Sequence, residues 1–228
     1  MDKEINNNGF DYVDLGLPSG TLWATCNVGA SKPSDFGLYF QWGDTKGYTK
    51  EQIEKGKEKE FMRSDYKWSS GRTFTKYRTK GEMLEIEDDA AHANMGGDWH
   101  IPTPDQIQEL INETTNTLIK PLIGVNGILF TSKTDTSKSI FIPDASYVWG
   151  DFIFNSQIYG SGNGTVWTSM LSADDVNDGQ RLLFCTGYVG LGNNCRYEGL
   201  PVRGVIGQII KGKNNDERRI RVRVKHKF

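Results

Sequence analysis

Two aspartates and two histidines near the middle of the chain are residue types that could bind a metal ion or transfer protons. They are Asp88, Asp89, His92 and His100. In a helix, Asp88 and His92 would share one face at a spacing of four residues and could present two ligands together. The sequence offers no visible third ligand, and the double glycine at 96–97 is typical of a helix end. We therefore expect a structural role, in which these polar groups brace the loop that follows the helix.

The cysteine content gives no support to a zinc site. The chain has three cysteines and three histidines without a C-x-x-C spacing, and this does not make a recognisable zinc ligand set. We expect Cys26, Cys185 and Cys195 to be free thiols in a reducing compartment.

The motifs of common catalytic and nucleotide-binding sites are missing from the sequence. It contains no G-x-S-x-G, no H-E-x-x-H, no phosphate-cradling Gly-Lys-Ser/Thr loop and no EF-hand pattern. Between residues 46 and 86, basic and aromatic side chains are interleaved as in proteins that bind single-stranded nucleic acid, but glutamates interrupt the positive charge. We expect no enzymatic activity, no cofactor, no metal and no nucleic-acid partner.

Length and charge indicate one large domain with a distinct tail. The chain has 228 residues, of which 36% are hydrophobic and 26 are glycine, as suits a globular domain with many tight turns. Residues 211–228 carry eight Lys or Arg and two Asp or Glu, which leaves 19 basic and 27 acidic residues elsewhere, a net charge of −8. The first residues show no secretion signal, and no apolar run is long enough to span a membrane. We expect a cytoplasmic or virion-associated protein with no membrane partner.

Hydrophobic periodicity predicts short strands around two central helices. Strands are expected at 10–15, 21–26, 37–43, 128–131 and 139–143, the last two forming a hairpin. The excursion at 46–86 is expected to pack onto the body through its aromatic residues. A short helix is expected at 87–94. Thr103, Pro104 and Gln106 form a capping box that predicts a second helix, which should fray at the threonines at 114, 115 and 117.

The two ends of the chain are expected to lie outside the domain at 10–207. Residues 1–9 are predicted to be a flexible N-terminus, and residues 208–228 a basic strand or arm. Near the C-terminus, arginine and lysine alternate with Ile220, Val222 and Val224. Such a strand is either an edge that its charge guards against aggregation, or an arm that docks on an acidic partner such as a neighbouring copy of this body.

The segment 166–205 combines an apolar skeleton with side chains suited to contact. Its polar and aromatic residues are expected mostly on loops, and they are Arg181, Tyr188, Asn193, Asn194, Arg196, Tyr197 and Glu198. Rigid aromatic area beside adaptable amides is typical of paratopes. Arg203 is expected to brace loops through bidentate hydrogen bonds. We interpret the segment as a binding surface, the alternative being an ordinary run of solvated β-hairpins.

Several separated stretches match one family pattern. They are YVDLGLPSGTLWATCNVGA at 12–30, FGLYFQWGDT at 36–45, EDDAAHANMGGDWHIPTPDQIQEL at 87–110, GVNGILF at 124–130, SIFIPDASY at 139–147 and VWTSML to RYEGLPVRGV at 166–205. In these stretches the chain resembles the Fibrobacter succinogenes major paralogous domain, a bacterial and phage family similar to the C-type-lectin-like fold. Residues 46–86 and 208–228 fall outside the resemblance.

The resemblance implies an α+β chain of C-type-lectin-like fold, with two helices against small mixed and antiparallel sheets, long loops and a C-terminal β-hairpin appendage. In related proteins, diversity-generating retroelements rewrite selected positions of a ligand-display region that corresponds to 166–205. Relatives often carry tyrosine or asparagine where this chain has Met170, Asn177, Arg181, Leu183, Cys185, Tyr188, Gly190, Leu191, Asn194, Cys195 and Glu198. The scaffold residues are expected to include Trp167, Leu182, Phe184 and Arg203. The ligand-binding residues are expected to be Met170, Asn177, Arg181, Leu183, Tyr188, Leu191, Asn193, Asn194, Tyr197 and Glu198.

Two other activities of the wider fold fit the sequence less well. Formylglycine-generating oxidases bind copper through a cysteine pair near the C-terminus, but the spacing of Cys185 and Cys195 does not match that pair. Calcium-dependent sugar binding needs clustered carboxylates and amides in an E-P-N or Q-P-D arrangement. Oxygen ligands without that arrangement are available from Asp174, Asp175, Asn177 and Asp178.

We therefore expect a non-enzymatic protein that binds an unknown protein or glycan ligand, as a phage receptor-binding or retroelement-diversified protein would. The alternative is an assembly protein that docks through residues 211–228 in a homo-oligomer or on a virion partner.

Overall fold

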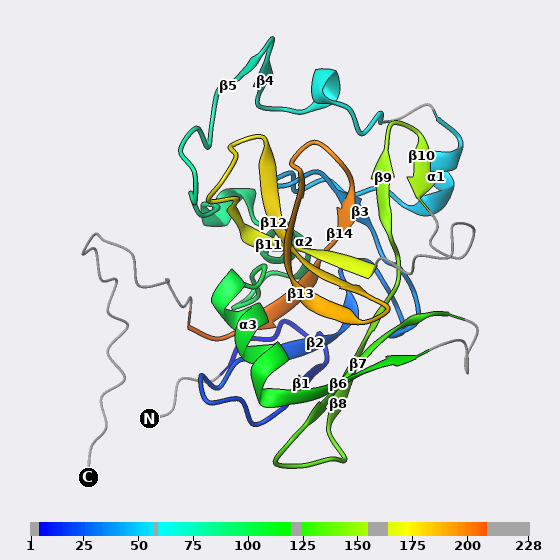
Figure 1. Cartoon of the computed structure of the whole chain (residues 1–228), viewed down its shortest axis with the longest axis vertical. Coiled ribbons are helices and arrows are strands. Elements are labelled where there is room, and N and C mark those ends of the chain that lie inside the picture. The colour runs from blue at the N-terminus through cyan, green and yellow to red at the C-terminus, as the bar shows by residue number, and fades with distance from the viewer. Residues whose placement is uncertain (1–4, 57–58, 120–124, 155–163, 209–228) are drawn as a thin grey trace.

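The computed structural model describes residues 5–56, 59–119, 125–154 and 164–208. These residues form an α+β structure of short helices and small antiparallel sheets, which confirms the predicted class at that level (Figure 1). No helix within these ranges is long and apolar enough to cross a membrane. The predicted basic arm from residue 209 onward lies outside the described residues.

The helices of the described chain are short. They are α1 (Lys50–Glu54), α2 (Ala90–Met95) and α3 (Pro104–Glu113), with 3-10 turns at Arg63–Asp65 and Ile86–Asp88. The capping box that begins α3 is confirmed, because the Thr103 side chain accepts from the Gln106 amide and the Gln106 side chain accepts from the Thr103 amide. The predicted fraying of α3 is wrong, since its threonines begin strand β6 (Thr114–Ile119), which pairs with β7.

Within the described ranges, the strands form three larger sheets and three pairs. The larger sheets are β1 (Tyr12–Asp14), β2 (Leu22–Asn27) and β15 (Arg203–Ile206); β6, β7 (Gly127–Ser132) and β8 (Ser139–Pro143); and β11 (Gly164–Leu171), β12 (Asp178–Cys185) and β13 (Tyr188–Cys195). The pairs are β3 (Tyr39–Phe40) with β14 (Leu200–Pro201), β4 (Ser69–Ser70) with β5 (Thr73–Phe74), and β9 (Tyr147–Trp149) with β10 (Phe152–Phe154). The predicted hairpin of β7 and β8 is confirmed.

The side chains expected on loops of the display region lie mainly on strands instead. Arg181 is on β12, and Tyr188, Asn193 and Asn194 are on β13. Strands β12 and β13 pair over their whole length around a two-residue turn at 186–187. Gly190 and Gly192 leave one face of β13 with few side chains. The alternation of apolar and polar residues that marks a strand is therefore not visible in the sequence.

Helix α3 packs against one face of the β11–β13 sheet. Ile107 and Leu110 of the helix share a buried cluster with Val166, Leu182 and Phe184 of the sheet. This contact fixes which face of β12 and β13 is turned away from the helix, and it places two of the expected scaffold residues in the core.

The excursion is packed onto the body by its aromatic residues, as predicted. In Figure 1 its strands β4 and β5 pass over the top of the molecule. Tyr66, Trp68, Phe74 and Tyr77 are buried in the main core beside Trp167.

Arg196 joins this excursion to the end of β13 and is not a surface residue. Its side chain is 0% exposed, and Nε donates to Tyr66 Oη at 2.8 Å. Nη1 donates to the Tyr77 and Val176 carbonyls at 2.7 and 3.2 Å, and Nη2 to that of Lys76 at 3.2 Å. The expectation that Arg196 serves contact is wrong, because every bonded N–H of the guanidinium is committed inside the protein.

A second buried arginine, Arg203, joins two sheets. Its Nε donates to Asn27 Oδ1 at 2.9 Å, Nη1 to the Ala24 carbonyl at 2.9 Å and Nη2 to the Phe141 carbonyl at 2.8 Å. Arg203 thus braces β2 and β8 from β15. The pKa of Arg203 is lowered to about 10 by its complete burial.

The N-terminal residues that the structure describes are bonded to the body. Asn8 Nδ2 donates to the Met95 carbonyl at 2.7 Å, and Trp99 Nε1 donates to the Asn7 carbonyl at 2.8 Å. The predicted flexible N-terminus therefore does not include these residues.

Replacing Arg196 tests the link between the excursion and the sheet. We expect Arg196→Met to lower the free energy of unfolding by about 3 kcal/mol, because a tyrosine hydroxyl, one buried carbonyl and two partly buried carbonyls lose their donor. The exposed Arg78 of the same excursion is the matched control, and Arg78→Met should change stability by less than about 0.5 kcal/mol. Urea unfolding of both variants measures this, and equal losses in the two would contradict the assignment.

Candidate binding surface

The pairing register of β12 and β13 divides their side chains between two faces. Residues directly opposite one another in an antiparallel pair project to the same side of the sheet. The pairs Leu182–Leu191 and Phe184–Val189 belong to the α3 cluster. The other side, here called the outer face, carries Arg181, Leu183 and Cys185 from β12, opposite Gly192, Gly190 and Tyr188 of β13, and then Asn194.

Two glycines shape the outer face of β13. The hydroxyl of Tyr188 reaches past Gly190 and donates to the Leu191 carbonyl at 3.0 Å. A Cβ at Gly190 would lie 2.5 Å from that hydroxyl, so the ring occupies the space that a side chain would fill. Arg181 Nε likewise donates to the Asn193 carbonyl at 3.1 Å, beside Gly192. Tyr188 remains 48% exposed while its hydroxyl is fixed.

The end of the outer face that is farthest from the turn at 186–187 carries charged groups that are partly buried. Burial raises the pKa of the Glu198 carboxyl to about 7, although Arg181 opposes this shift and Asn194 donates to the carboxylate. Burial also lowers the pKa of Arg181 and raises that of Asp178, which lies at the same end of the strands but on the α3 side. Arg181 Nη1 is buried and has no hydrogen-bond partner among the described residues. Perturbed titrating groups of this kind cluster at functional sites more often than elsewhere.

An aromatic hairpin adjoins this charged end and was missed from the sequence. Strand β9 is bonded to Gly199 in both directions, at 2.8 and 2.9 Å through Val148. One face of β9 and β10 carries only aromatic side chains, Tyr147, Trp149, Phe152 and Phe154, which together are called the aromatic hairpin below. The signal was present in the sequence YVW-GD-FIF, in which aromatic residues alternate on both sides of a Gly-Asp turn.

The structure brings together only part of the expected ligand-binding set. Arg181, Leu183, Tyr188 and Asn194 share the outer face, and Glu198 meets them through Asn194. Leu191 and Asn193 project toward the α3 side, where Leu191 packs on the core and Asn193 is exposed.

Three other expected ligand-binding residues lie away from the outer face. Met170 forms a backbone bridge with Met83. Asn177 Oδ1 accepts from Arg63 Nη1 at 2.8 Å. Tyr197 packs against the main core.

The aspartate and histidine cluster has the bracing role predicted for it, although its geometry differs. Asp88 lies in the 3-10 turn before α2 and accepts from Lys67, Lys76 and Tyr77, so it does not share a helix face with His92. Asp89 caps α2 by accepting from the His92 amide at 2.9 Å, and it also accepts from the Ile101 amide at 2.8 Å in the following loop.

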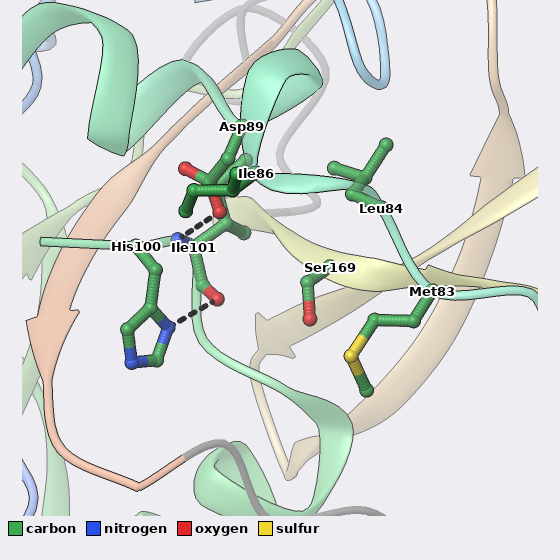
Figure 2. Close-up of a pocket in the computed structure, with 7 residues that line it drawn as sticks. All are labelled: Met83, Leu84, Ile86, Asp89, His100, Ile101 and Ser169. Carbon is green, nitrogen blue, oxygen red and sulfur yellow. Dashed lines mark hydrogen bonds between the residues drawn. The ribbon is translucent and has the colours of Figure 1, made fainter. Parts of the chain in front are cut away.

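A small cavity lies beside this cluster (Figure 2). Its lining consists of Met83, Leu84, Ile86, Asp89, His100, Ile101 and Ser169, and its volume is about 40 Å³. Burial raises the pKa of Asp89. A space of this size holds a few water molecules, whereas pockets for organic ligands start at about 300 Å³. The cavity is therefore a poor candidate for a substrate site.

Metal and copper chemistry gain no support from the described residues. No three His, Cys, Asp or Glu side chains within them are grouped so that they could hold a metal ion. Cys185 and Cys195 lie at opposite ends of the β12–β13 hairpin. Seven residue steps along the strands separate them, roughly 24 Å. A thiol pair for copper is thus not formed in this structure.

The raised pKa of Glu198 predicts a pH-dependent stability. Its ordinary pKa is 4.5, so between pH 4.5 and about 7 the unfolded chain has lost a proton that the folded chain still holds. The free energy of unfolding should therefore fall as the pH rises through this window, and Glu198→Gln should reduce that fall. The exposed Glu87 gives the control variant Glu87→Gln. Denaturant unfolding at several pH values would refute the assignment if the Glu198→Gln and wild-type slopes agree.

Comparison of the chain with protein-family models, curated proteins and solved structures finds no match. The family resemblance thus stays a prediction from the sequence motifs, and the function has to be argued from the geometry of the surface.

Proposed function

We propose that this chain is a non-catalytic binding protein with a C-type-lectin-like scaffold, and that the outer face of β12 and β13 contacts the ligand. The main support is the state of Tyr188, which is 48% exposed yet held over Gly190 by its hydrogen bond to the Leu191 carbonyl. A ring that is already fixed offers contact area at a small cost in conformational entropy when a ligand binds.

The frame behind this face supports the proposal. Leu182 and Phe184 are buried against α3, so the strands that carry the outer face are held from behind. Because successive residues of a strand alternate between faces, outer-face residues can vary while the core contacts stay the same. A ligand-display region requires that the residues that hold the fold be different from the residues that contact the ligand.

The positions implied by the resemblance also gather on this face. Relatives often carry tyrosine or asparagine at six positions that meet here, namely Arg181, Leu183, Cys185, Tyr188, Gly190 and Asn194. Small side chains surround Tyr188 and leave the face shallow, with Leu183 as its apolar centre. A shallow face of aromatic, apolar and amide groups suits a protein or glycan surface better than a small substrate.

A comparison of the two faces of the β12–β13 hairpin tests the proposal. Binders selected from a peptide-display library and from a glycan array against the wild-type chain serve as probes. Tyr188→Ala and Leu183→Ser should each weaken binding at least about tenfold, because they remove the fixed ring and the apolar centre. Asn193→Ala, also exposed on β13 but on the other face, is the matched control and should leave binding within about threefold.

The melting temperature of each variant separates lost contact from lost fold. Unchanged binding in folded Tyr188→Ala and Leu183→Ser variants would contradict the proposal. A loss of binding seen only with Asn193→Ala would contradict it as well.

A further inference from the structure

The aromatic hairpin is an exposed surface that the proposed function does not use. Trp149 is 47% and Phe152 45% exposed, and both project from the same face of a two-stranded sheet. Tyr147 and Phe154 stack beside them at a centroid distance of 4.6 Å, and Phe152 meets Phe154 edge to face at 5.0 Å. Aromatic side chains gathered in this way are typical of the core of a protein interface.

Trp149 and Phe152 are exposed rather than part of the core, whereas Tyr147 also packs against the main core. The reverse face of the hairpin supplies Val148 and Ile153 to a cluster around Tyr39 and Phe61. Gly150 at the turn is bonded to Phe61 in both directions, at 3.0 and 3.2 Å. The hairpin is thus anchored from behind and presents its aromatic face outward on a fixed frame.

The surroundings of the aromatic face favour a basic partner. Asp151 is exposed at the turn. The pKa of Tyr147 is raised first by burial and then by the Glu198 carboxyl, while Arg181 lowers it. Lys50 on the adjoining helix α1 is already paired with Glu54 at 3.6 Å. Arginine and lysine bind well over aromatic faces, most of all where carboxylates are near.

We infer that the aromatic hairpin docks the basic C-terminal segment, residues 211–228, of a neighbouring copy of this chain. That segment carries eight Lys or Arg, whereas the rest of the chain has a net charge of −8. Its alternation gives one apolar edge, Ile220, Val222 and Val224, that can cover the rings while the flanking cations reach the rim.

A neighbouring copy suits the geometry better than the chain's own segment. The end of the described chain, orange-red in Figure 1, lies at the left of the view, whereas β9 and β10 lie at the upper right. Because the docked segment and the receiving hairpin are different surfaces, two copies can exchange the segment reciprocally in a dimer, or the contact can run head to tail through more copies.

Light scattering during gel filtration of the full chain tests this inference. The wild type should associate as its concentration rises, less so at high ionic strength, and deletion of 211–228 should leave monomers. Trp149→Ser combined with Phe152→Ser should weaken association at least about tenfold. The matched control is Phe10→Ser with Tyr12→Ser, two aromatic residues that are 41% and 39% exposed on another element.

A second measurement covers the case in which the double variant fails to fold. A synthetic peptide of residues 209–228, added to the chain that lacks them, should change the fluorescence of Trp149, taken as the difference from a Trp149→Phe variant. A peptide with serine at 220, 222 and 224 should bind more weakly.

Three results would overturn the inference: a wild type that stays monomeric at every concentration, association unchanged in the folded double variant, or no response to the peptide. A monomer whose Trp149 signal changes when the segment is deleted would assign the hairpin to the chain's own segment instead. Tyr188→Ala should leave association intact, so this test and that of ligand binding fail separately.

Discussion

The burial of the Arg196 guanidinium is the constraint on which the candidate surface depends. A buried cation is tolerable only when its N–H groups find acceptors, and here three carbonyls and the hydroxyl of Tyr66 supply them. The rings of Phe74 and Tyr66 lie over its carbon at 4.3 and 5.0 Å. Acceptors and rings come largely from the excursion, so the end of β13 and the excursion must order together.

The hydrogen bonds of Arg196 fix the path of the chain before and after this residue. Before it, β13 is held in register with β12, so its glycines leave the outer face open for Tyr188 and Arg181. After it, the chain turns through Glu198 to Gly199, which bonds to β9 and brings the aromatic hairpin next to the charged end of β13. One buried side chain thus positions two surfaces that are far apart in sequence, and the outer face and the aromatic hairpin can serve different partners.

The sequence predicted those features that depend on residue type and spacing within a short stretch. The capping box of α3, the β7–β8 hairpin and the burial of the excursion's aromatic residues follow from spacing and residue type alone. It did not predict that Arg196 is buried, because an arginine beside Tyr197 has the same local appearance in a core as on a surface. It also placed Arg181 and Tyr188 on loops, since Gly190 and Gly192 erase the alternation that marks a strand. Leu191 and Tyr188 lie on opposite faces of the sheet, and this follows only from the pairing register, which depends on contacts distant in sequence.

The residues that hold the fold and the residues proposed to contact the ligand lie on opposite faces of the same strands. A mutational scan of residues 178–198, read out in parallel for folded yield and for retention of a selected binder, measures this most directly. We expect Leu182, Phe184 and Arg196 to tolerate few substitutions in either readout. Leu183, Tyr188 and Asn194 should accept many substitutions for folding but few for binding. Positions that lose binding without losing the fold should alternate along each strand on the outer face. A scan in which those positions lie on the α3 side, or in which binding falls only where folding does, would contradict the account.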